Sequence, residues 1–294
     1  MKKILIVGAS GIIGKYLSQS LNSKYQLTNI SRNSNDNPTF FSVDLLKEKS
    51  ITSFVKNSET FDCLIFLVGL AHKRKKNKKI SDYRDVNFLT LKNLLSILKS
   101  HNKIPEKLIF ASTISVYREK IDKNIYYEKS KTLPKSYYAI TKLEAEDYLL
   151  NNYYNQSWIL RLAPVYSRKF NLNIDRRIKF LNFGFRVGDG MSKISLCQIE
   201  NIKFAVEAII DEKVPLGLYN ISDSIDYNYN QLHSYNKIRP LIRIPRFIVK
   251  IIYIIAKMFN LHTIEEFSIK LISDNIYPSR KFRKFSDLPS SIGS

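Results

Sequence analysis

Cysteine is scarce in this chain, which has two among 294 residues. Cys63 and Cys197 stand far apart in apolar stretches, without the spacing of a zinc site or of a disulfide framework. Glycine and proline number nine each, which leaves little room for low-complexity linkers. The four histidines are scattered, and no two have ligand spacing on a predicted helix. We therefore expect an ordered globular protein with two reduced core thiols and no metal.

Long apolar runs are also missing. A bilayer-spanning helix needs about 20 apolar residues, whereas the longest late stretch, residues 247–259, is interrupted by Lys250 and Lys257. The N-terminal run at residues 4–7 resembles the apolar part of a signal peptide, but glycines interrupt the pattern and Lys15 follows. We interpret this run as a strand and expect a cytoplasmic protein.

Acidic residues are few beside basic ones, 26 against 47, and the net charge is +21. Such a field attracts nucleic acid, an anionic membrane or a phosphorylated substrate. The densest basic run, residues 73–79, is expected to be a solvated loop, and it lacks the interleaved aromatics of a nucleic-acid-binding element. Nucleic acid is therefore not an expected partner. In residues 238–259, basic side chains surround a predicted apolar helix. This helix is expected either to pack on the core or to lie peripherally at the inner face of a membrane.

The first two-thirds of the sequence alternates short apolar runs with longer amphipathic ones, a pattern typical of βαβ units around a parallel sheet. Strands are predicted at residues 3–7, 25–30, 63–68, 108–112 and 158–162, and helices at 11–21, 82–99 and 136–152. We predict an α/β fold with a Rossmann-type doubly wound sheet over residues 1–165. Residues 166–294, with helices at 202–210 and 247–259, form a smaller substrate-binding lobe, and residues 195–222 return to the Rossmann core.

Three of the nine glycines cluster directly after the first strand. Gly8, Gly11 and Gly14 have the spacing of a dinucleotide-binding turn: the first permits the turn, the second lets backbone N–H groups approach a pyrophosphate, and the third lets helix and strand pack closely. The predicted cofactor contacts in this loop are Gly8, Ser10, Gly11, Ile12, Ile13 and Gly14.

Cofactor choice is indicated at the end of the second strand. An acidic residue there would bind the ribose hydroxyls of NAD(H), but this chain has Arg32, whose guanidinium suits a 2′-phosphate. NADP(H) is accordingly preferred slightly over NAD(H), with an exposed Arg32 without cofactor contact as the alternative. Asp44 and Leu45 are placed to hold the adenine.

Two further segments carry hydroxyl and amine groups suited to alcohol–ketone chemistry. Tyr138 and Lys142 lie one helical turn apart, and a nearby cation stabilises a phenolate that acts as general acid or base. Ser112 and Thr113 follow the strand at 108–110, where their hydroxyls can hold the oxygen on which the tyrosine acts.

These three elements, in this order, resemble those of the extended short-chain dehydrogenases/reductases of the nucleotide-sugar epimerase/dehydratase family, over about residues 3–224. The resemblance implies Tyr138 as acid/base, Lys142 as its tuner and ribose anchor, and Thr113 as the assisting hydroxyl. It also implies cofactor contacts at Val68, Gly69, Asn87, Ala163 and Val165, and substrate contacts at Ser112, Thr113, Ile114, Arg176 and Arg177. Relatives are often dimers through two helices, one of which corresponds to residues 136–152.

The departures from the family pattern narrow the expected reaction. Dehydratases carry an acidic pair directly after the catalytic threonine, where this chain has Ile114 and Ser115, so sugar dehydration is not expected. Reduction of a 4-keto sugar and 4-epimerisation both remain open, on a UDP- or dTDP-linked sugar and in the synthesis of surface polysaccharide precursors. The alternatives are a dehydrogenase of a non-nucleotide alcohol and a non-catalytic NADP(H)-binding interaction protein.

Overall fold

The structure is a computed structural model that describes residues 1–32, 39–71, 79–117, 119–121, 124–180 and 183–292. Its chain forms two compact units. The first consists of Met1–Thr113, Tyr137–Arg161 and Val206–Leu218, and the second of Ile114–Ser136, Leu162–Ala205 and Tyr219–Ser294. His72 and residues 73–78 of the basic run lie outside the described residues.

A seven-stranded sheet has the order β3-β2-β1-β4-β5-β7-β13. Its strands are β1 (Lys3–Val7), β2 (Gln26–Ser31), β3 (Phe40–Ser42), β4 (Cys63–Phe66), β5 (Lys107–Thr113), β7 (Ser157–Leu162) and β13 (Gly217–Ile221). The β1–β2, β1–β4, β2–β3 and β4–β5 pairs are parallel. The order reverses direction at β1, which is the arrangement of a doubly wound nucleotide-binding sheet. The predicted α/β Rossmann-type fold is confirmed.

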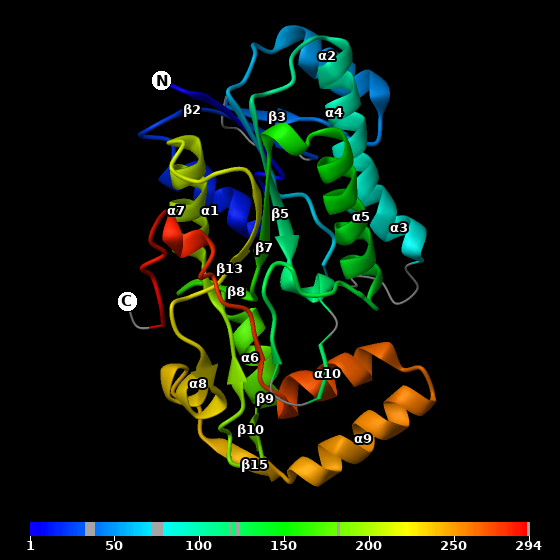
Figure 1. The fold of residues 1–294 in the computed structure, drawn as a ribbon, viewed down its shortest axis with the longest axis vertical. Helices are drawn as coiled ribbons and strands as arrows, with labels where there is room; N and C mark the ends of the chain where they lie inside the picture. Colours follow the sequence, from blue (N-terminus) through cyan, green and yellow to red (C-terminus); the bar gives the residue numbers. More distant parts are fainter. Residues whose placement is uncertain (33–38, 72–78, 118, 122–123, 181–182, 293–294) are drawn as a thin grey trace. The chain divides into compact units, whose positions relative to one another are not determined.

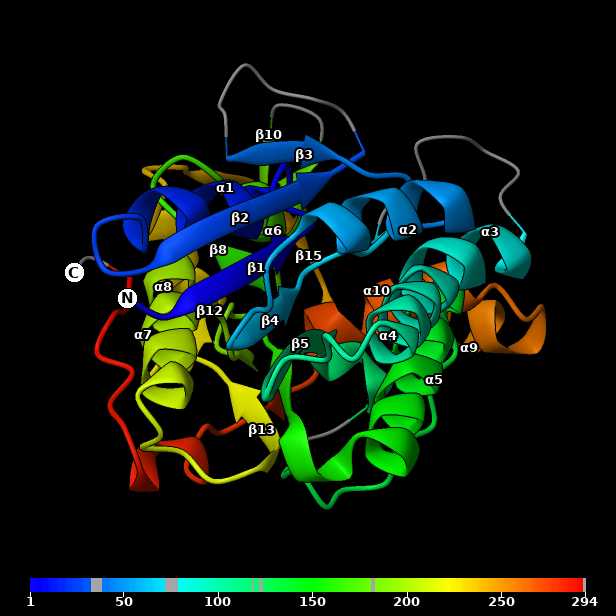
Figure 2. The same cartoon turned by 90° about the horizontal axis from the view of Figure 1, so that it is seen from above.

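Continuous burial of apolar residues explains why these segments become central strands. Ile4 to Val7 of β1 are fully buried, and so are all four residues of β4. Strands buried on both faces read as unbroken apolar runs rather than alternating ones, because helices cover both sides of the sheet. Figures 1 and 2 show α2 (Glu48–Asn57), α4 (Thr90–Ser100) and α5 (Tyr137–Asn152) on one face, and α1 (Ile12–Ser20) on the other. The second half of α7 (Ile199–Ile210), from Val206 on, also belongs to the first unit.

The helix predicted at residues 82–99 is interrupted. It consists of α3 (Ile80–Arg84), a π-helical segment (Asp85–Leu89) and α4. A π-helical turn inserts one extra residue into the helical repeat and is frequent at functional sites. In this chain it holds Asn87, which is fully buried.

The described residues of the second unit form three small sheets, with orders β15-β10-β9, β14-β11-β16-β6 and β12-β8. The strands are β6 (Asn124–Ile125), β8 (Val165–Tyr166), β9 (Lys179–Phe180), β10 (Phe183–Val187), β11 (Lys193–Ile194), β12 (Cys197–Gln198), β14 (Tyr227–Asn228), β15 (Pro240–Ile244) and β16 (Asn275–Ile276). The helices are α6 (Leu172–Ile178), α8 (Tyr229–Tyr235), α9 (Arg246–Met258) and α10 (His262–Ile272). Tyrosine, isoleucine and leucine side chains fill its core. No helix among the described residues is both long enough and apolar enough to cross a membrane.

Candidate active site and cofactor loop

The glycine loop joins the carboxyl end of β1 to the first turn of α1. Gly8 has a φ of +91°, which favours glycine, and its N–H donates to the carbonyl oxygen of Ile30 at 2.9 Å. A Cβ on Gly14 would lie 2.4 Å from the carbonyl oxygen of Gly8, so only glycine permits this approach of helix to strand. Ser10, Gly11 and Ile12 are exposed at the helix N-terminus, and Ile13 is half-buried.

The free N–H groups of a helix N-terminus attract anions, because the helix dipole places partial positive charge there. α1 has no acidic residue in its first turn and no side-chain cap at Gly11. The start of this helix therefore suits a pyrophosphate, as the glycine spacing predicts.

The adenosine end of the predicted cofactor site lies at β2 and β3. Arg32 directly follows β2 and its side chain is exposed, while its carbonyl oxygen accepts a bond from Ser42 at 3.0 Å. The Asp44 carboxylate accepts the N–H of Leu46 at 3.1 Å and lies 3.8 Å from the Lys47 ammonium. Leu45 is buried, and its carbonyl oxygen accepts from the Asn93 amide. Asp44 and Leu45 thus hold their own loop in place.

Tyr138 and Thr113 form the centre of the candidate active site. Tyr138 is the second residue of α5, and Thr113 is the last residue of β5. Their hydroxyl groups are hydrogen-bonded. Burial raises the pKa of Tyr138 to about 12, and the bond with Thr113 lowers it in part. The phenol is therefore protonated at neutral pH, with a second hydroxyl beside it.

Lys142 lies one turn after Tyr138 and is almost fully buried. Its Nζ donates to the carbonyl oxygens of Val68 at 2.9 Å and Ala111 at 2.8 Å. It also lies 4.5 Å from the centre of the Phe110 ring. Burial lowers the pKa of Lys142 to about 7, against the opposing influence of Glu146. The amine is held at the carboxyl ends of β4 and β5, where open α/β sheets place their ligands.

Asn87 connects the π-helical turn to the same sheet edge. Its amide donates to the Thr141 hydroxyl at 2.9 Å and its oxygen accepts the Leu70 N–H at 2.6 Å. A Cβ on Gly69 would lie 3.3 Å from Nζ of Lys142, so a small residue leaves room for the amine. The structure thus brings Val68, Gly69 and Asn87 together with Lys142, whereas the role of each toward a cofactor stays a prediction.

A buried ion pair lies one turn further along α5, and it was not anticipated from the sequence. Glu146 is fully buried and accepts from Nη2 of Arg161 at 2.6 Å and from Nε at 3.1 Å. The hydroxyl of Ser112 also donates to Glu146. The sequence signal was available as a glutamate four residues after Lys142, on the same helix face. Ser112, predicted to contact substrate, therefore has its hydroxyl engaged by the carboxylate.

Five predicted contact residues belong to the second unit, namely Ile114, Ala163, Val165, Arg176 and Arg177. Ile114 is buried, and the Ala163 N–H donates to Ile221 at 3.0 Å. On α6, Arg176 is exposed, whereas Arg177 donates to the carbonyl oxygen of Asn173 and burial lowers its pKa. The two adjacent guanidiniums therefore have different surroundings, with Arg176 exposed and Arg177 half-buried.

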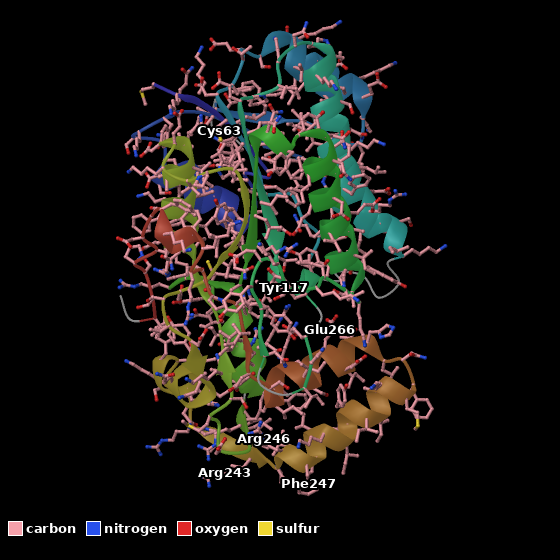
Figure 3. All side chains as sticks on the ribbon, viewed as in Figure 1. Cys63, Tyr117, Arg243, Arg246, Phe247 and Glu266 are labelled. Atoms are coloured by element: carbon pink, nitrogen blue, oxygen red, sulfur yellow. The ribbon has the colours of Figure 1, made fainter. Side chains whose placement is uncertain are left out.

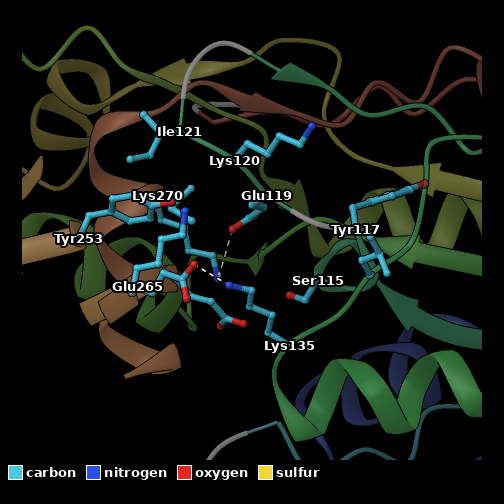
Figure 4. Close-up of a pocket in the computed structure, with 13 residues that line it drawn as sticks. Ser115, Tyr117, Glu119, Lys120, Ile121, Lys135, Tyr253, Glu265 and Lys270 are labelled. Carbon is cyan, nitrogen blue, oxygen red and sulfur yellow. Dashed lines mark hydrogen bonds and ion pairs between the residues drawn. The ribbon is translucent and has the colours of Figure 1, made fainter. Parts of the chain in front are cut away.

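A cavity of about 290 Å³ lies within the second unit and is shown in Figure 4. Its lining begins at Ser115, two residues after Thr113 in the chain, and includes side chains from α9 and α10. Lys135 pairs with Glu265 at 2.6 Å, and Lys270 lies 3.9 Å from Glu119. The cavity thus contains charges of both signs, which is unlike a purely cationic phosphate site.

The described residues contain no candidate metal site, because no three or more histidine, cysteine, aspartate or glutamate side chains among them come together in a group that could hold a metal ion. Both cysteines are buried, and burial raises the pKa of the Cys63 thiol to about 12. A thiol of this kind is a core residue rather than a nucleophile.

Comparisons with known proteins agree with this architecture. The model of the NAD dependent epimerase/dehydratase family matches residues 4–197. The Bacillus subtilis (strain 168) protein YtcB, named an uncharacterized UDP-glucose epimerase, is 31% identical over 185 residues, which cover 56% of this chain and 57% of that protein.

Solved structures are similar over almost the whole chain. UDP-glucuronic acid 4-epimerase from Bacillus cereus in complex with NAD has a TM-score of 0.72 at 21% identity, over 98% of this chain and 94% of that one. UDP-N-acetylglucosamine 4-epimerase from the same species has a TM-score of 0.70 at 17% identity, over 100% and 95%. A human epimerase family protein with NADPH has a TM-score of 0.72 at 15% identity, over 96% and 93%. The structural likenesses establish the fold, and the matched family model covers well over half of the sequence. The chain belongs to the NAD dependent epimerase/dehydratase family.

Proposed function

We propose that this protein is an NAD(P)-dependent epimerase that inverts the C4 carbon of a UDP-linked sugar. The observation that carries this proposal is the hydrogen-bonded pair of Thr113 and Tyr138, with the buried Lys142 one helical turn away. General acid–base work on a sugar hydroxyl requires a proton carrier and a second group that holds the oxygen. Support also comes from the names of relatives and similar structures, which include UDP-sugar 4-epimerases.

The residues of the first unit fit a dinucleotide. Gly14 leaves no room for a Cβ against Gly8, and the exposed N-terminus of α1 offers N–H groups to a pyrophosphate. Arg32 would contact a ribose phosphate, and Lys142 together with Asn87 would hold the nicotinamide ribose. When bound, the nicotinamide accepts a hydride from the ring carbon and returns it.

Tyr138 moves the proton in the proposed reaction. Its deprotonated form, the phenolate, takes the proton of the C4 hydroxyl while the C4–H bond breaks and the C4–O bond gains double-bond character. It returns that proton after the keto sugar has presented its other face. Thr113 holds the sugar oxygen by a hydrogen bond, so the reacting oxygen stays within reach of the phenol. The hydrogen bond with Thr113 opposes the effect of burial on the pKa of Tyr138. Lys142, when protonated, would favour the phenolate further by its positive charge.

A second candidate is an NADPH-dependent reductase of a 4-keto sugar. Arg32 favours it, because this exposed guanidinium at the end of β2 suits a 2′-phosphate and a consumable electron donor is more often NADPH. In that reaction Tyr138 donates a proton to the keto oxygen and then takes up another proton from solvent. Either activity would supply precursors for surface polysaccharides, and a dTDP-linked sugar is the other nucleotide form to test.

The test is incubation of the purified protein with UDP-glucose, UDP-N-acetylglucosamine, UDP-glucuronic acid and dTDP-glucose. Each is combined with NAD⁺ or NADP⁺, and the products are separated by anion-exchange chromatography. Inversion of C4 without net change in cofactor absorbance at 340 nm supports epimerisation. In a parallel incubation of NADPH with a 4-keto sugar nucleotide, stoichiometric oxidation of NADPH would select the reductase instead. Turnover of a steroid or other non-nucleotide alcohol, with no sugar nucleotide converted, would overturn both candidates, and binding of cofactor without any turnover would indicate an interaction protein.

A further inference from the structure

Most of the apolar side chains of helix α9 are exposed rather than packed into a core. Of its 13 residues only Val249 and Ala256 are buried. Phe247 is 62% exposed and Ile254 is 60% exposed. We call the exposed apolar residues of this helix the outer face; they are Phe247, Ile248, Ile251, Ile252, Ile254, Ile255 and Met258. A contiguous apolar surface of this kind on a soluble protein marks a docking site.

The residues of α9 sort into three sectors around the helix axis. At about 100° per residue, Val249, Tyr253 and Ala256 lie in one narrow sector, and it is this sector that is turned to the protein. The outer face spans an arc of roughly 160°. The basic residues Arg246, Lys250 and Lys257 form a stripe at one border of that arc, and α9 contains no acidic residue.

Neighbouring elements of the same unit enlarge the outer face. Exposed apolar side chains lie before it on β15, after it in the turn into α10, and within α10 itself, namely Leu241, Ile242, Phe259, Leu261, Ile264 and Phe267. Arg243, on β15, is also exposed. Figure 3 labels Arg243, Arg246 and Phe247 close together where β15 leads into α9, and Figure 1 shows α9 antiparallel to α10. Apolar and cationic side chains are therefore presented together.

We propose that the outer face of α9 docks on an anionic membrane surface, with the helix lying in the plane of the interface. The apolar arc would enter the boundary between headgroups and acyl chains, while Lys250 and the exposed Arg243 of β15 contact anionic headgroups. The other two residues of the stripe also contact the protein, since Arg246 donates to the carbonyl oxygen of Ile272 and Lys257 lines the cavity. A 13-residue helix is about 20 Å long, which is too short to cross a hydrocarbon core of about 30 Å. Charge complementarity selects this occupant.

A second copy of the chain is a poorer occupant of the outer face. Two-fold pairing through α9 would place the same basic stripe beside its own copy, and each chain carries a net charge of +21. Like charges in contact oppose association. An anionic bilayer offers negative headgroups beside an apolar phase, which matches both parts of the helix surface.

The experiment is co-sedimentation of the full chain with vesicles of phosphatidylcholine alone or of phosphatidylcholine and phosphatidylglycerol at 3:1. The test variant is Ile251→Asp. Its matched control is Ile225→Asp in the same unit, because Ile251 and Ile225 are 51% and 50% exposed. Lys250→Glu, with exposed Lys284→Glu as its control, tests the basic stripe. Residues 253 and 257 are left unchanged, since both line the cavity of the second unit.

We expect the wild type to pellet with the anionic vesicles and to be released as the salt concentration is raised. Ile251→Asp and Lys250→Glu should each lower the partition coefficient on the order of tenfold, while their controls stay within about twofold of wild type. Wild type that remains in the supernatant with anionic vesicles overturns the proposal. Equal binding of Ile251→Asp and wild type does so as well. A dimer in solution that Ile251→Asp dissociates, without vesicle binding, would assign the outer face to a second copy. None of these readouts depends on the proposed catalytic activity.

Discussion

The carboxylate of Glu146 and the guanidinium of Arg161 form an ion pair inside the first unit, in which both Nε and Nη2 donate to the carboxylate and the side chains are 1% and 5% exposed. Glu146 lies one turn after Lys142 on α5, and Arg161 lies on β7, so the pair ties the helix that carries Tyr138 to the sheet. Ser112, on β5, adds a further hydrogen bond to the same carboxylate. The spacing between Thr113 and α5 is therefore fixed by buried charge as well as by packing.

Glu146→Gln should destabilise the protein by about 3–5 kcal/mol, because it leaves the guanidinium of Arg161 buried without its counter-charge. The measurement is urea unfolding followed by far-UV circular dichroism. Glu144→Gln is the matched control, on the same helix two residues earlier, where an ion pair with Arg84 is exposed. That control should change stability by less than about 1 kcal/mol. Equal losses in the two variants would show that the buried pair has no special role.

Lys142 should make stability depend on pH in a defined window. Folding lowers its pKa from 10.5 to about 7, so between these values the unfolded chain binds more protons than the folded one. Its contribution to stability therefore rises with pH across the window, by at most about 1.4 kcal/mol per pH unit, and is constant below pH 7.

Comparison with Lys142→Met isolates that contribution, because other groups titrate alike in both proteins. The difference in unfolding free energy, wild type minus variant, should grow by about 2 kcal/mol between pH 7 and pH 9. Lys99→Met, at an exposed position, is the control for loss of one positive charge. A difference that stays constant or shrinks with pH would contradict the burial of an ammonium at this site.

Gly14→Ala should impair both folding and cofactor binding, since its Cβ would lie 2.4 Å from a backbone oxygen that has no freedom to move. We expect a loss of about 1–3 kcal/mol in stability. Gly11→Ala, whose nearest contact would be 3.3 Å, should be markedly milder in stability. Thermal unfolding of the two variants is the measurement, and a Gly11→Ala variant that is the less stable of the two would refute the packing argument.

Arg32→Glu tests the preference for NADP(H). Replacing the guanidinium by a carboxylate should weaken binding of NADPH by roughly tenfold or more and leave that of NADH within a few-fold, since only NADPH carries the 2′-phosphate. Fluorescence titration of both cofactors gives the ratio of dissociation constants. Arg280→Glu, also exposed, controls for net charge. An unchanged ratio in Arg32→Glu would mean that Arg32 does not contact the cofactor.

The central strands and the glycine turn could be predicted because local pattern decides them. Unbroken apolar runs such as β1 and β4 are stable only as strands of a sheet that is covered on both faces. Gly8, Gly11 and Gly14 define the turn from the first strand to the first helix. The proximity of Thr113 and Tyr138 followed from the fold, since both predicted elements end or begin at the same sheet edge. Their roles in catalysis stay predictions.

Tertiary partners were beyond the reach of local pattern. Glu146 shares a helix face with Lys142 and Glu144 does not, but this spacing does not identify Arg161 as the buried partner of the first or Arg84 as the surface partner of the second. The π-helical turn at Asp85–Leu89 was missed for a similar reason, because an added residue barely disturbs the apolar periodicity of a long helix. Whether the outer face of α9 is exposed depends on which other elements pack against the helix, and the apolar periodicity of the sequence carries no information about that.

The most direct test of the proposed catalytic role is the rate of C4 inversion by Tyr138→Phe, with Tyr137→Phe as its neighbour control. Tyr137 is 46% exposed at the start of α5 and its ring packs against Tyr83. On the UDP-sugar that the wild type converts, the account predicts a loss of roughly 10²–10⁴-fold in kcat for Tyr138→Phe. It predicts near wild-type turnover for Tyr137→Phe, with cofactor binding retained in both. Undiminished inversion by Tyr138→Phe in a folded, cofactor-bound preparation would contradict the assignment of Tyr138 as the acid and base.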